Sequence, residues 1–301
     1  MGLSLNMKKC RLCPRECGVD RAAGERGRCG MTDKLVVARA ALHMWEEPCL
    51  SGEEGSGTVF FSGCALGCVY CQNREIARAH TGKEITAQRL TDIFLELQNK
   101  RANNINLVTA GHYLPQVITA LRAAKERGLR IPIVYNSSGY EKAEAIRELD
   151  GLVEIYLSDM KYVSSELSAR YSFAADYFET AKKAIAEMVN QCGEARFDER
   201  GIMQRGVIVR HLQLPGCIED SKRVIRYLYE TYGDGIFISI MNQYTPLPHV
   251  SDYPEINRKL REKEYEDLVD YAIELGVLNG FLQEGEAASE SFIPPFDLEG
   301  V

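Results

Sequence analysis

The sequence lacks the apolar runs that a membrane or secreted protein would need. No stretch is long enough to cross a bilayer, and the first nine residues, Met-Gly-Leu-Ser-Leu-Asn-Met-Lys-Lys, lack the apolar core of a signal peptide. We therefore predict a cytoplasmic protein with no membrane partner. The sequence also contains no internal repeat or low-complexity tract, which argues against a repeat architecture.

Positive charge is in short supply. The 301 residues include 36 Lys and Arg against 43 Asp and Glu, which gives a formal net charge of −7 at pH 7. Without a broad basic surface to neutralise phosphates, we expect no nucleic-acid partner, and a protein or a small substrate fits better. The hydrophobic content of 45% is enough to bury one large α/β core and a small appendage.

Cysteine is plentiful by contrast, with ten residues in the chain. Disulfides are not expected in a reducing cytoplasm, so the clustering of these cysteines indicates metal or redox chemistry. Four lie near the N-terminus and three share one loop. The remaining three, Cys49, Cys192 and Cys217, stand alone, and we expect them to be small buried side chains.

From residue 57 onward, short apolar runs alternate with amphipathic stretches such as Leu90, Ile93, Phe94 and Leu97. Alternating strands and helices imply right-handed crossovers and a parallel sheet. We predict an α/β fold, namely an incomplete (β/α)6 TIM-like barrel. An open doubly wound sheet is the alternative, because periodicity does not establish closure. The six predicted strands cover residues 57–61, 105–109, 131–135, 153–157, 206–214 and 235–241.

The first 56 residues differ from the rest, because they are rich in cysteine, arginine and glycine and have no helical periodicity. We predict a cysteine-rich N-terminal segment over residues 1–56 and a barrel domain over residues 57–301. Residues 34–43 are expected to add one strand. The Glu46-Glu47 pair is expected to lie in a solvated turn, and Trp45 is expected to pack.

Three cysteines follow the first predicted barrel strand directly, in the loop Cys64-Ala-Leu-Gly-Cys68-Val-Tyr-Cys71. Active sites of β/α folds are built from loops after the carboxyl ends of strands. Three thiolates would hold three irons of a [4Fe-4S] cluster and leave the fourth iron for another ligand. A zinc-stabilised loop is the alternative, but a closed zinc site needs four ligands.

This spacing, with Tyr70 as the aromatic residue before the last cysteine, resembles the signature of the radical S-adenosylmethionine (radical SAM) superfamily. Nearly the whole chain resembles a less characterised branch of homologues of pyruvate formate-lyase activating enzyme. The resemblance implies that S-adenosylmethionine chelates the fourth iron. It also implies that reductive cleavage of this cofactor yields methionine and a 5′-deoxyadenosyl radical, which takes a hydrogen atom from the substrate.

Other segments at strand ends resemble that family as well. Asn136-Ser-Ser-Gly139 is similar to its Thr-Asn-Gly turn, Asp159-Met-Lys161 to its Asp-x-Lys segment, and residues 210–216 to its segment ending in Val-Pro-Gly. The family's Gly-Gly-Glu-Pro is replaced here by the stretch that begins Thr109-Ala-Gly-His112. The resemblance predicts the following cofactor-binding residues: Tyr70, Thr109, His112, Asn136, Ser138, Asp159, Lys161 and His211.

Plainer interpretations of these residues stay open. Asp159 and Lys161 lie on the same face of a strand and would pair with each other there. His211 would be a core histidine with its hydrogen bonds satisfied, and Ser137-Ser138-Gly139 would be an ordinary turn. No individual catalytic residue is predicted.

The second cysteine group has the pattern Cys-x2-Cys-x3-Cys-x11-Cys. Four thiolates within twenty residues are enough to close a tetrahedral metal site. The site would be either a zinc knuckle that staples a segment without its own core, or an auxiliary iron-sulfur cluster. The predicted ligands are Cys10, Cys13, Cys17 and Cys29.

The predicted function is that of a radical SAM oxidoreductase, similar to pyruvate formate-lyase activating enzyme. Family resemblance implies a glycyl radical protein as substrate and a flavodoxin or ferredoxin as reductant. Two alternatives are a radical SAM enzyme that modifies another peptide or a metabolite, and a non-catalytic binding module that both cysteine groups stabilise with metal.

Overall fold

The computed structural model describes residues 5–283 and 294–301. Within them, ten strands occur. Their bounds are β1 Leu35–His43, β2 Ser56–Phe61, β3 Lys83–Ile85, β4 Ile105–Val108, β5 Ile133–Ser137, β6 Ile155–Asp159, β7 Arg196–Phe197, β8 Met203–Leu212, β9 Phe237–Met241 and β10 Gly280–Leu282.

The strands form one sheet with the order β10-β9-β8-β6-β5-β4-β2-β1-β3, and β7 pairs with β8. From β2 to β10 the strands on this path are parallel, whereas β1 is antiparallel to both β2 and β3. The two end strands, β10 and β3, are not neighbours, so the barrel is open. The predicted α/β fold with an incomplete barrel is confirmed. The sheet also gains β10, a short parallel strand that the apolar pattern did not predict.

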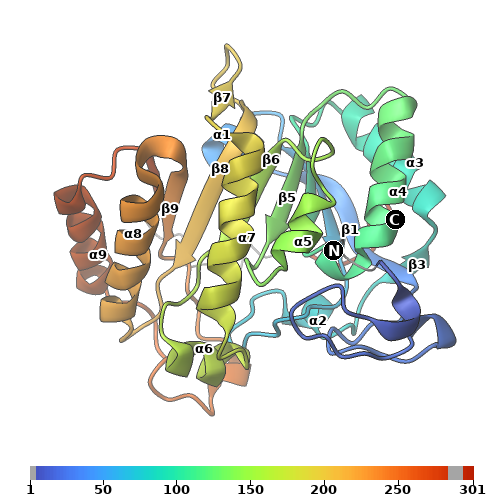
Figure 1. Ribbon diagram of the computed structural model, residues 1–301. Coiled ribbons are helices and arrows are strands. Elements are labelled where there is room, and N and C mark those ends of the chain that lie inside the picture. Colours follow the sequence, from blue (N-terminus) through green and yellow to red (C-terminus); the bar gives the residue numbers. More distant parts are fainter. Residues whose placement is uncertain (1–4, 284–293) are drawn as a thin grey trace.

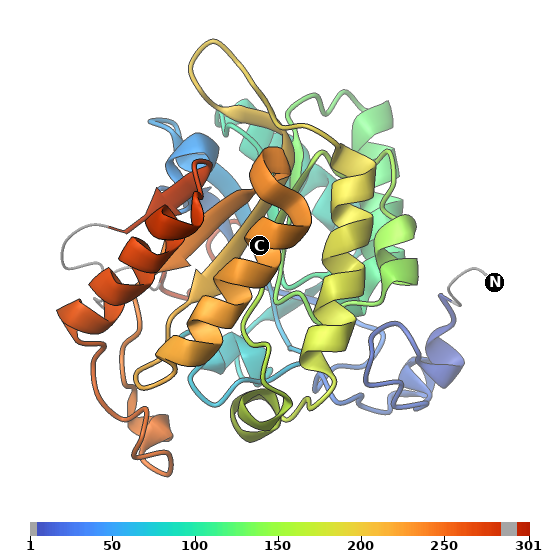
Figure 2. The same ribbon diagram turned by 60° about the vertical axis from the view of Figure 1, so that its left-hand side comes forward.

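Helices cover the outer face of this sheet (Figures 1 and 2). In α3, the Thr86 side chain caps the first turn by accepting a hydrogen bond from the Arg89 amide, and an apolar stripe is buried. The helices are α1 Pro48–Ser51, α2 Arg74–Ala77, α3 Ala87–Asn99, α4 Leu114–Glu126, α5 Ala143–Arg147, α6 Ser165–Ser172, α7 Tyr177–Cys192, α8 Ile218–Tyr232 and α9 Glu262–Leu275. Shorter 3-10 turns cover Met7–Lys9, Arg21–Ala23, Gly111–Tyr113, Gly233–Gly235 and Pro248–Val250.

A second, smaller core fills the inner side of the sheet near the amino ends of its parallel strands. Because β1 runs antiparallel to β2 and pairs His43 with Ser56, the chain that follows β1 arrives at this end. There Cys49 and Leu50 of α1 pack against inward-facing strand residues, namely Val134, Ile155, Leu157, Met203 and Ile208. This packing leaves the carboxyl ends of the strands for polar side chains.

Residues 5–34, the part of the N-terminal cysteine-rich segment that precedes β1, lie beside the carboxyl ends of the strands, near α2 (Figure 1). The strand predicted over residues 34–43 is confirmed as β1, which joins this segment to the main sheet. None of the helices in residues 5–283 and 294–301 combines the length and the apolar character that a membrane span needs.

Candidate functional site

The three-cysteine loop begins where β2 ends. All six residues of β2 are buried, and Ser62 and Gly63 lead from it to Cys64. Gly63 has φ +91°, and a Cβ there would overlap Met31 and the carbonyl oxygen of Cys29. Only glycine fits this turn under the N-terminal segment. The Cys64 amide then donates a hydrogen bond to the Cys29 carbonyl oxygen at 3.3 Å, so the two cysteine groups are directly linked.

Cys68 is buried and Cys64 and Cys71 are partly buried. Burial raises the pKa of the Cys71 thiol to about 12, with smaller contributions from the nearby Cys64 and Cys68. Burial also raises the pKa of Cys64, which Lys161 partly offsets. Iron binding would replace the thiol protons and neutralise the thiolates, so this environment suits a cluster better than free anions.

The donor set fits a [4Fe-4S] cluster. In residues 5–283 and 294–301, no group of three or more His, Cys, Asp or Glu side chains converges closely enough to hold one metal ion. A cluster with four irons has a different requirement, because each thiolate binds its own iron at a separate corner. Cys64, Cys68 and Cys71 supply three such thiolates from one loop and leave one corner free.

The end of α6 holds this loop in place. The Val69 amide donates to the Tyr171 carbonyl oxygen at 2.8 Å, and the Ser172 hydroxyl donates to the Cys68 sulfur at 3.0 Å. Tyr162 extends this contact into a chain, since its hydroxyl lies 2.9 Å from the Ser172 hydroxyl and donates to the Tyr70 hydroxyl at 2.7 Å. A buried hydrogen-bond chain therefore ends on a candidate cluster ligand.

A charged network lies beside the loop on the inner face of the barrel. Asp159 forms ion pairs with Lys161 at 2.6 Å and with Arg210 at 3.1 Å. Arg210 also donates to the Asn136 side-chain oxygen at 2.7 Å and pairs with Glu46 at 3.3 Å. The parallel register places Asp159 opposite Arg210, so two neighbouring strand ends supply the centre of this network.

Burial and charge work against each other here. Burial opposes the charged form of Asp159, but Lys161 and Arg210 hold its pKa below the usual range. Burial likewise disfavours the charged form of Lys161, but Asp159 raises its pKa above the usual value. Both groups are therefore charged at neutral pH, and they present fixed charges of opposite sign next to the cysteine loop.

The expectation of a solvated turn at Glu46 and Glu47 is wrong. The Glu46 side chain is only 8% exposed and accepts a hydrogen bond from the Asn106 amide group at 2.9 Å. Glu47 is buried as well, and burial raises the pKa of both carboxyls. The turn after β1 enters the barrel instead of leaving it. Trp45, expected to pack, is 64% exposed.

The other predicted cofactor residues divide between the site and its surroundings. Tyr70 is buried against the cysteine loop through its bond to Tyr162. Ser138 is half-buried, and its carbonyl oxygen accepts a hydrogen bond from the Tyr177 hydroxyl at 2.8 Å. Thr109 has φ +62°, a strained conformation for a β-branched residue, at the place where the family's motif has glycine.

Neither predicted histidine joins the charged network. His112 contacts the Ser62 carbonyl oxygen at 2.8 Å, and His211 contacts the Met160 carbonyl oxygen at 2.8 Å. Burial lowers the pKa of each to about 4, so both rings are neutral at pH 7. Because adjacent strand residues face opposite sides, His211 points away from the face that Arg210 occupies.

Sequence reasoning missed Glu46, Arg210 and Ser172. Arg210 carried a usable signal, because it precedes His211 at a predicted strand end and strand alternation puts only one of the two inside. Glu46 and Ser172 carried none, since each reaches the site from an element whose path the sequence does not reveal.

The four N-terminal cysteines lie near one another, although not closely enough to hold one metal ion as they stand. A Cβ on Gly27 would lie 3.3 Å from the Cys17 sulfur and 3.4 Å from the Cys29 sulfur. Burial raises the pKa of Cys13 to about 12, with smaller contributions from Cys29 and Cys10. The guanidinium of Arg21, which is fully buried, lies 3.8 Å from the Cys10 sulfur. For the Cys29 thiol, burial raises the pKa and Arg21 opposes this rise, which matters because the thiolate is the form that binds metal.

The comparisons with known proteins agree with this geometry. Residues 58–192 match the sequence model of the radical SAM superfamily. An uncharacterized protein of Methanocaldococcus jannaschii is 29% identical over 271 residues, which cover 88% of this chain and 74% of that protein. The pyruvate formate-lyase-activating enzyme of Clostridium pasteurianum is 33% identical over 138 residues, which cover 44% of this chain and 56% of that enzyme.

A solved structure with the same fold is HydG, a maturase of the [FeFe]-hydrogenase. It matches with a TM-score of 0.50 at 13% identity, over 73% of this chain and 49% of that chain. This chain thus spans little more than half the length of the clostridial enzyme and about half of HydG. Residues 58–192, which carry the cysteine loop after the first parallel barrel strand, therefore form a domain of the radical SAM superfamily.

Proposed function

We propose that this protein is an enzyme in which Cys64, Cys68 and Cys71 hold a [4Fe-4S] cluster whose fourth iron binds S-adenosylmethionine. The observation that carries the proposal is the position of these three thiols beside Lys161 and the charged network at the strand ends. When bound, the cluster supplies the electron that cleaves the cofactor to methionine and a 5′-deoxyadenosyl radical.

The chain's own residues would bind and shield the cofactor. Asp159 and Arg210 present charges that suit hydroxyl, amino and carboxylate groups, and Asn136 adds a side-chain amide next to Arg210. Tyr70 and Tyr162 line the loop with buried rings, which would exclude water from the reactive centre.

As substrate we propose a glycine residue in a partner protein, from which a hydrogen atom is removed to give a glycyl radical. The support is the partial likeness to pyruvate formate-lyase-activating enzymes. The stretch from Thr109 to His112 stands here in place of the family's motif with glutamate. Another peptide or a metabolite is therefore the alternative substrate that the experiment has to exclude.

The test of the central proposal is anaerobic reconstitution followed by a cleavage assay. We expect about four irons per chain at the loop and release of 5′-deoxyadenosine with dithionite and S-adenosylmethionine. Cys64→Ala should abolish both, whereas Cys192→Ala, a change at a buried cysteine of α7, should keep both. Intact cleavage in Cys64→Ala, or zinc in the loop without cleavage, would refute the proposal, and the latter would favour the binding module.

The substrate requires a separate measurement. Adding a candidate glycyl radical protein should produce a glycyl radical signal in electron paramagnetic resonance that depends on both the enzyme and S-adenosylmethionine. If cleavage is normal but no candidate protein gives the signal, while a deuterated peptide or metabolite transfers its label to 5′-deoxyadenosine, the glycine proposal is wrong and the cleavage proposal stands.

For the N-terminal group we propose a second metal site at Cys10, Cys13, Cys17 and Cys29. The buried Arg21 supports it, because a site with four thiolates carries excess negative charge. Metal analysis of the Cys64→Ala, Cys68→Ala, Cys71→Ala triple variant would show either zinc or iron remaining. Loss of all metal from this variant would contradict the second site.

A further inference from the structure

A cavity of about 150 Å³ lies next to the candidate cluster loop, between the two cysteine groups. It borders Cys64 and Cys29 but neither Cys68 nor Cys71, so it lies beside the cluster position and not within it. Its lining residues come from the N-terminal segment, the loop and the end of α2: Arg28, Cys29, Gly30, Cys64, Leu66, Gly67, Ala77 and Arg78.

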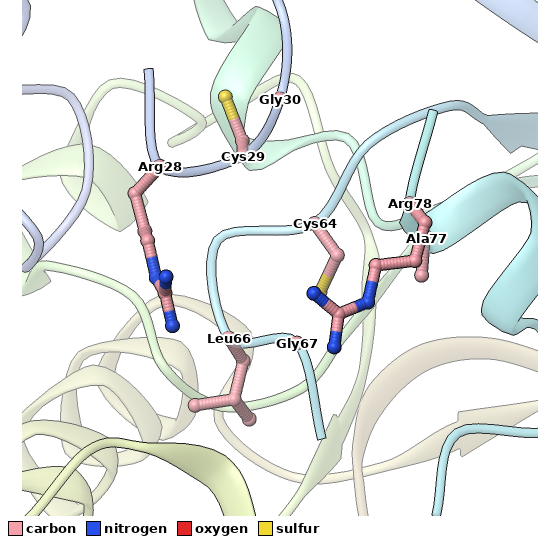
Figure 3. A pocket seen from close by; sticks show the side chains of 8 residues that line it. All are labelled: Arg28, Cys29, Gly30, Cys64, Leu66, Gly67, Ala77 and Arg78. Carbon is pink, nitrogen blue, oxygen red and sulfur yellow. The ribbon is translucent and has the colours of Figure 1, made fainter. Parts of the chain in front are cut away.

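Two exposed arginines flank this cavity. Figure 3 shows the guanidinium groups of Arg28 and Arg78 on either side of the loop that carries Cys64. In the part of the chain that the structure describes, no carboxylate forms an ion pair with either of them. Arg28 stacks over the Phe173 ring at 5.6 Å, which holds its charge at the rim.

More positive charge surrounds the pair. Arg26 donates to the carbonyl oxygen of Gly30, which lines the cavity, at 2.7 Å. On the other side of the cavity, Arg74 and Arg78 lie near His249. Burial is the main cause that lowers the pKa of His249, and these two arginines lower it further. The acidic residue on α2, Glu75, is hydrogen-bonded by the Thr81 hydroxyl.

This local excess of positive charge contrasts with the net charge of the whole chain, which is −7. The net charge would repel an acidic protein, whereas this rim would attract it. Cys64 borders the same cavity, so a group docked here comes close to the candidate cluster without crossing the barrel. Complementary patches on oppositely charged proteins steer association and fix orientation.

We propose that the rim formed by Arg26, Arg28, Arg74 and Arg78 is the docking surface for an acidic electron-donor protein that carries a low-potential flavin or iron-sulfur centre. The inference deepens the proposed function and rests on it. One electron leaves the donor centre, which is oxidised, and reduces the cluster from the 2+ to the 1+ state. No proton or chemical group moves in this step.

The test compares a protein donor with a small one. Reduction of the anaerobically reconstituted protein is followed by stopped-flow absorbance with flavodoxin hydroquinone, with a reduced acidic ferredoxin, and with dithionite. For the unmodified chain, the rate with the protein donors should fall steeply from about 20 mM to about 300 mM salt.

Arg28→Glu with Arg78→Glu should slow reduction by the protein donors at least about tenfold at low salt and remove most of the salt dependence. Reduction by dithionite should be unchanged, which shows that the cluster and fold persist. The neutral pair Arg28→Gln with Arg78→Gln should fall in between. Arg122→Glu, a charge reversal at an exposed arginine of α4, is the matched control and should stay within about twofold of the unmodified rate.

The inference is overturned if the charge-reversed variant accepts electrons from the protein donors as fast as the unmodified chain. It is also overturned if neither protein donor reduces the unmodified cluster while dithionite does. Absence of a cluster, or of cleavage with dithionite, would instead refute the proposed function. Failure of the docking proposal and failure of the proposed function are therefore distinguishable.

Discussion

Arg210 joins two carboxylates that come from opposite ends of the barrel. It pairs with Glu46 from the turn after β1 and with Asp159 from the end of β6. Both acids are largely buried, so removal of the shared cation would break the ion pair of Glu46 and leave Asp159 paired with Lys161 in a low-dielectric site. Arg210 therefore connects Glu46 and Asp159 in this part of the interior.

Arg210→Ala should lower the free energy of unfolding by about 3–5 kcal/mol, because it removes the cation that the buried Glu46 and Asp159 share. Urea denaturation of the purified protein measures this. Arg122→Ala, at an exposed site, should change stability by no more than about 0.5 kcal/mol. Adding Glu46→Gln to Arg210→Ala should restore part of the loss, and no recovery would show that the two groups are not coupled.

The Ser172 hydroxyl donates a hydrogen bond to the sulfur of Cys68, a candidate cluster ligand. A hydrogen bond to a ligand sulfur stabilises the more negative, reduced cluster and so raises its potential. Ser172→Ala should shift the midpoint potential of the loop cluster to more negative values, on the order of tens of millivolts. Potentiometric titration followed by electron paramagnetic resonance measures the shift. Ser168→Ala, at a buried serine of the same helix, should leave the potential unchanged.

At the scale of elements, the N-terminal segment serves as a brace for the cysteine loop. Arg15, between Cys13 and Cys17, donates to the carbonyl oxygens of Ala65 at 2.9 Å, Leu66 at 3.2 Å and Ser172 at 3.1 Å. A single side chain therefore joins the segment, the loop and the end of α6. Phe173, in a left-handed conformation at φ +54°, ends α6 at this junction.

Arg15→Ala should loosen the loop locally without unfolding the protein. Loss of these charged hydrogen bonds should cost about 2 kcal/mol of local stability, which corresponds to about 30-fold faster amide hydrogen exchange over residues 64–69. Mass spectrometry of exchange measures it. Arg11→Ala, in the same segment, should not change exchange in the loop. Equal exchange in both variants would show that the brace is not needed.

For the whole molecule, stability should depend on pH through Glu141. This residue is buried against Gly111, and burial raises its pKa from the ordinary 4.5 to about 8. Between these two values the folded state keeps a proton that the unfolded state has lost. Stability must therefore fall as pH rises through this window and level off above it.

Glu141→Gln should remove this contribution while keeping the shape of the side chain. Relative to the unmodified protein, the variant should gain stability from pH 5 to pH 8 by a few kcal/mol, at about 1.4 kcal/mol per unit of pKa shift. Denaturant unfolding at a series of pH values measures the difference. A constant difference across this range would show that Glu141 is already charged at low pH.

Local patterns in the sequence were enough to predict most of the sheet. The apolar runs of β2, β4, β5, β6, β8 and β9 are buried strands because both faces of each are covered. The three residues of β10 are too few to show a period, so this strand could not be predicted. The closeness of Cys64, Cys68 and Cys71 likewise follows from sequence, since one short loop holds all three.

Only the tertiary structure determines which partners the charged and polar side chains of the site have. The carboxylate of Glu46 enters the barrel because β1 runs antiparallel to β2 and delivers the next turn to the inner side. Arg210 meets Asp159 because two strands pair in a particular register, and Ser172 meets Cys68 because α6 ends against the loop. Sequence determined which chemical groups are available, since spacing and periodicity are local. Their partners depend on crossovers and register between distant segments, which no local pattern encodes.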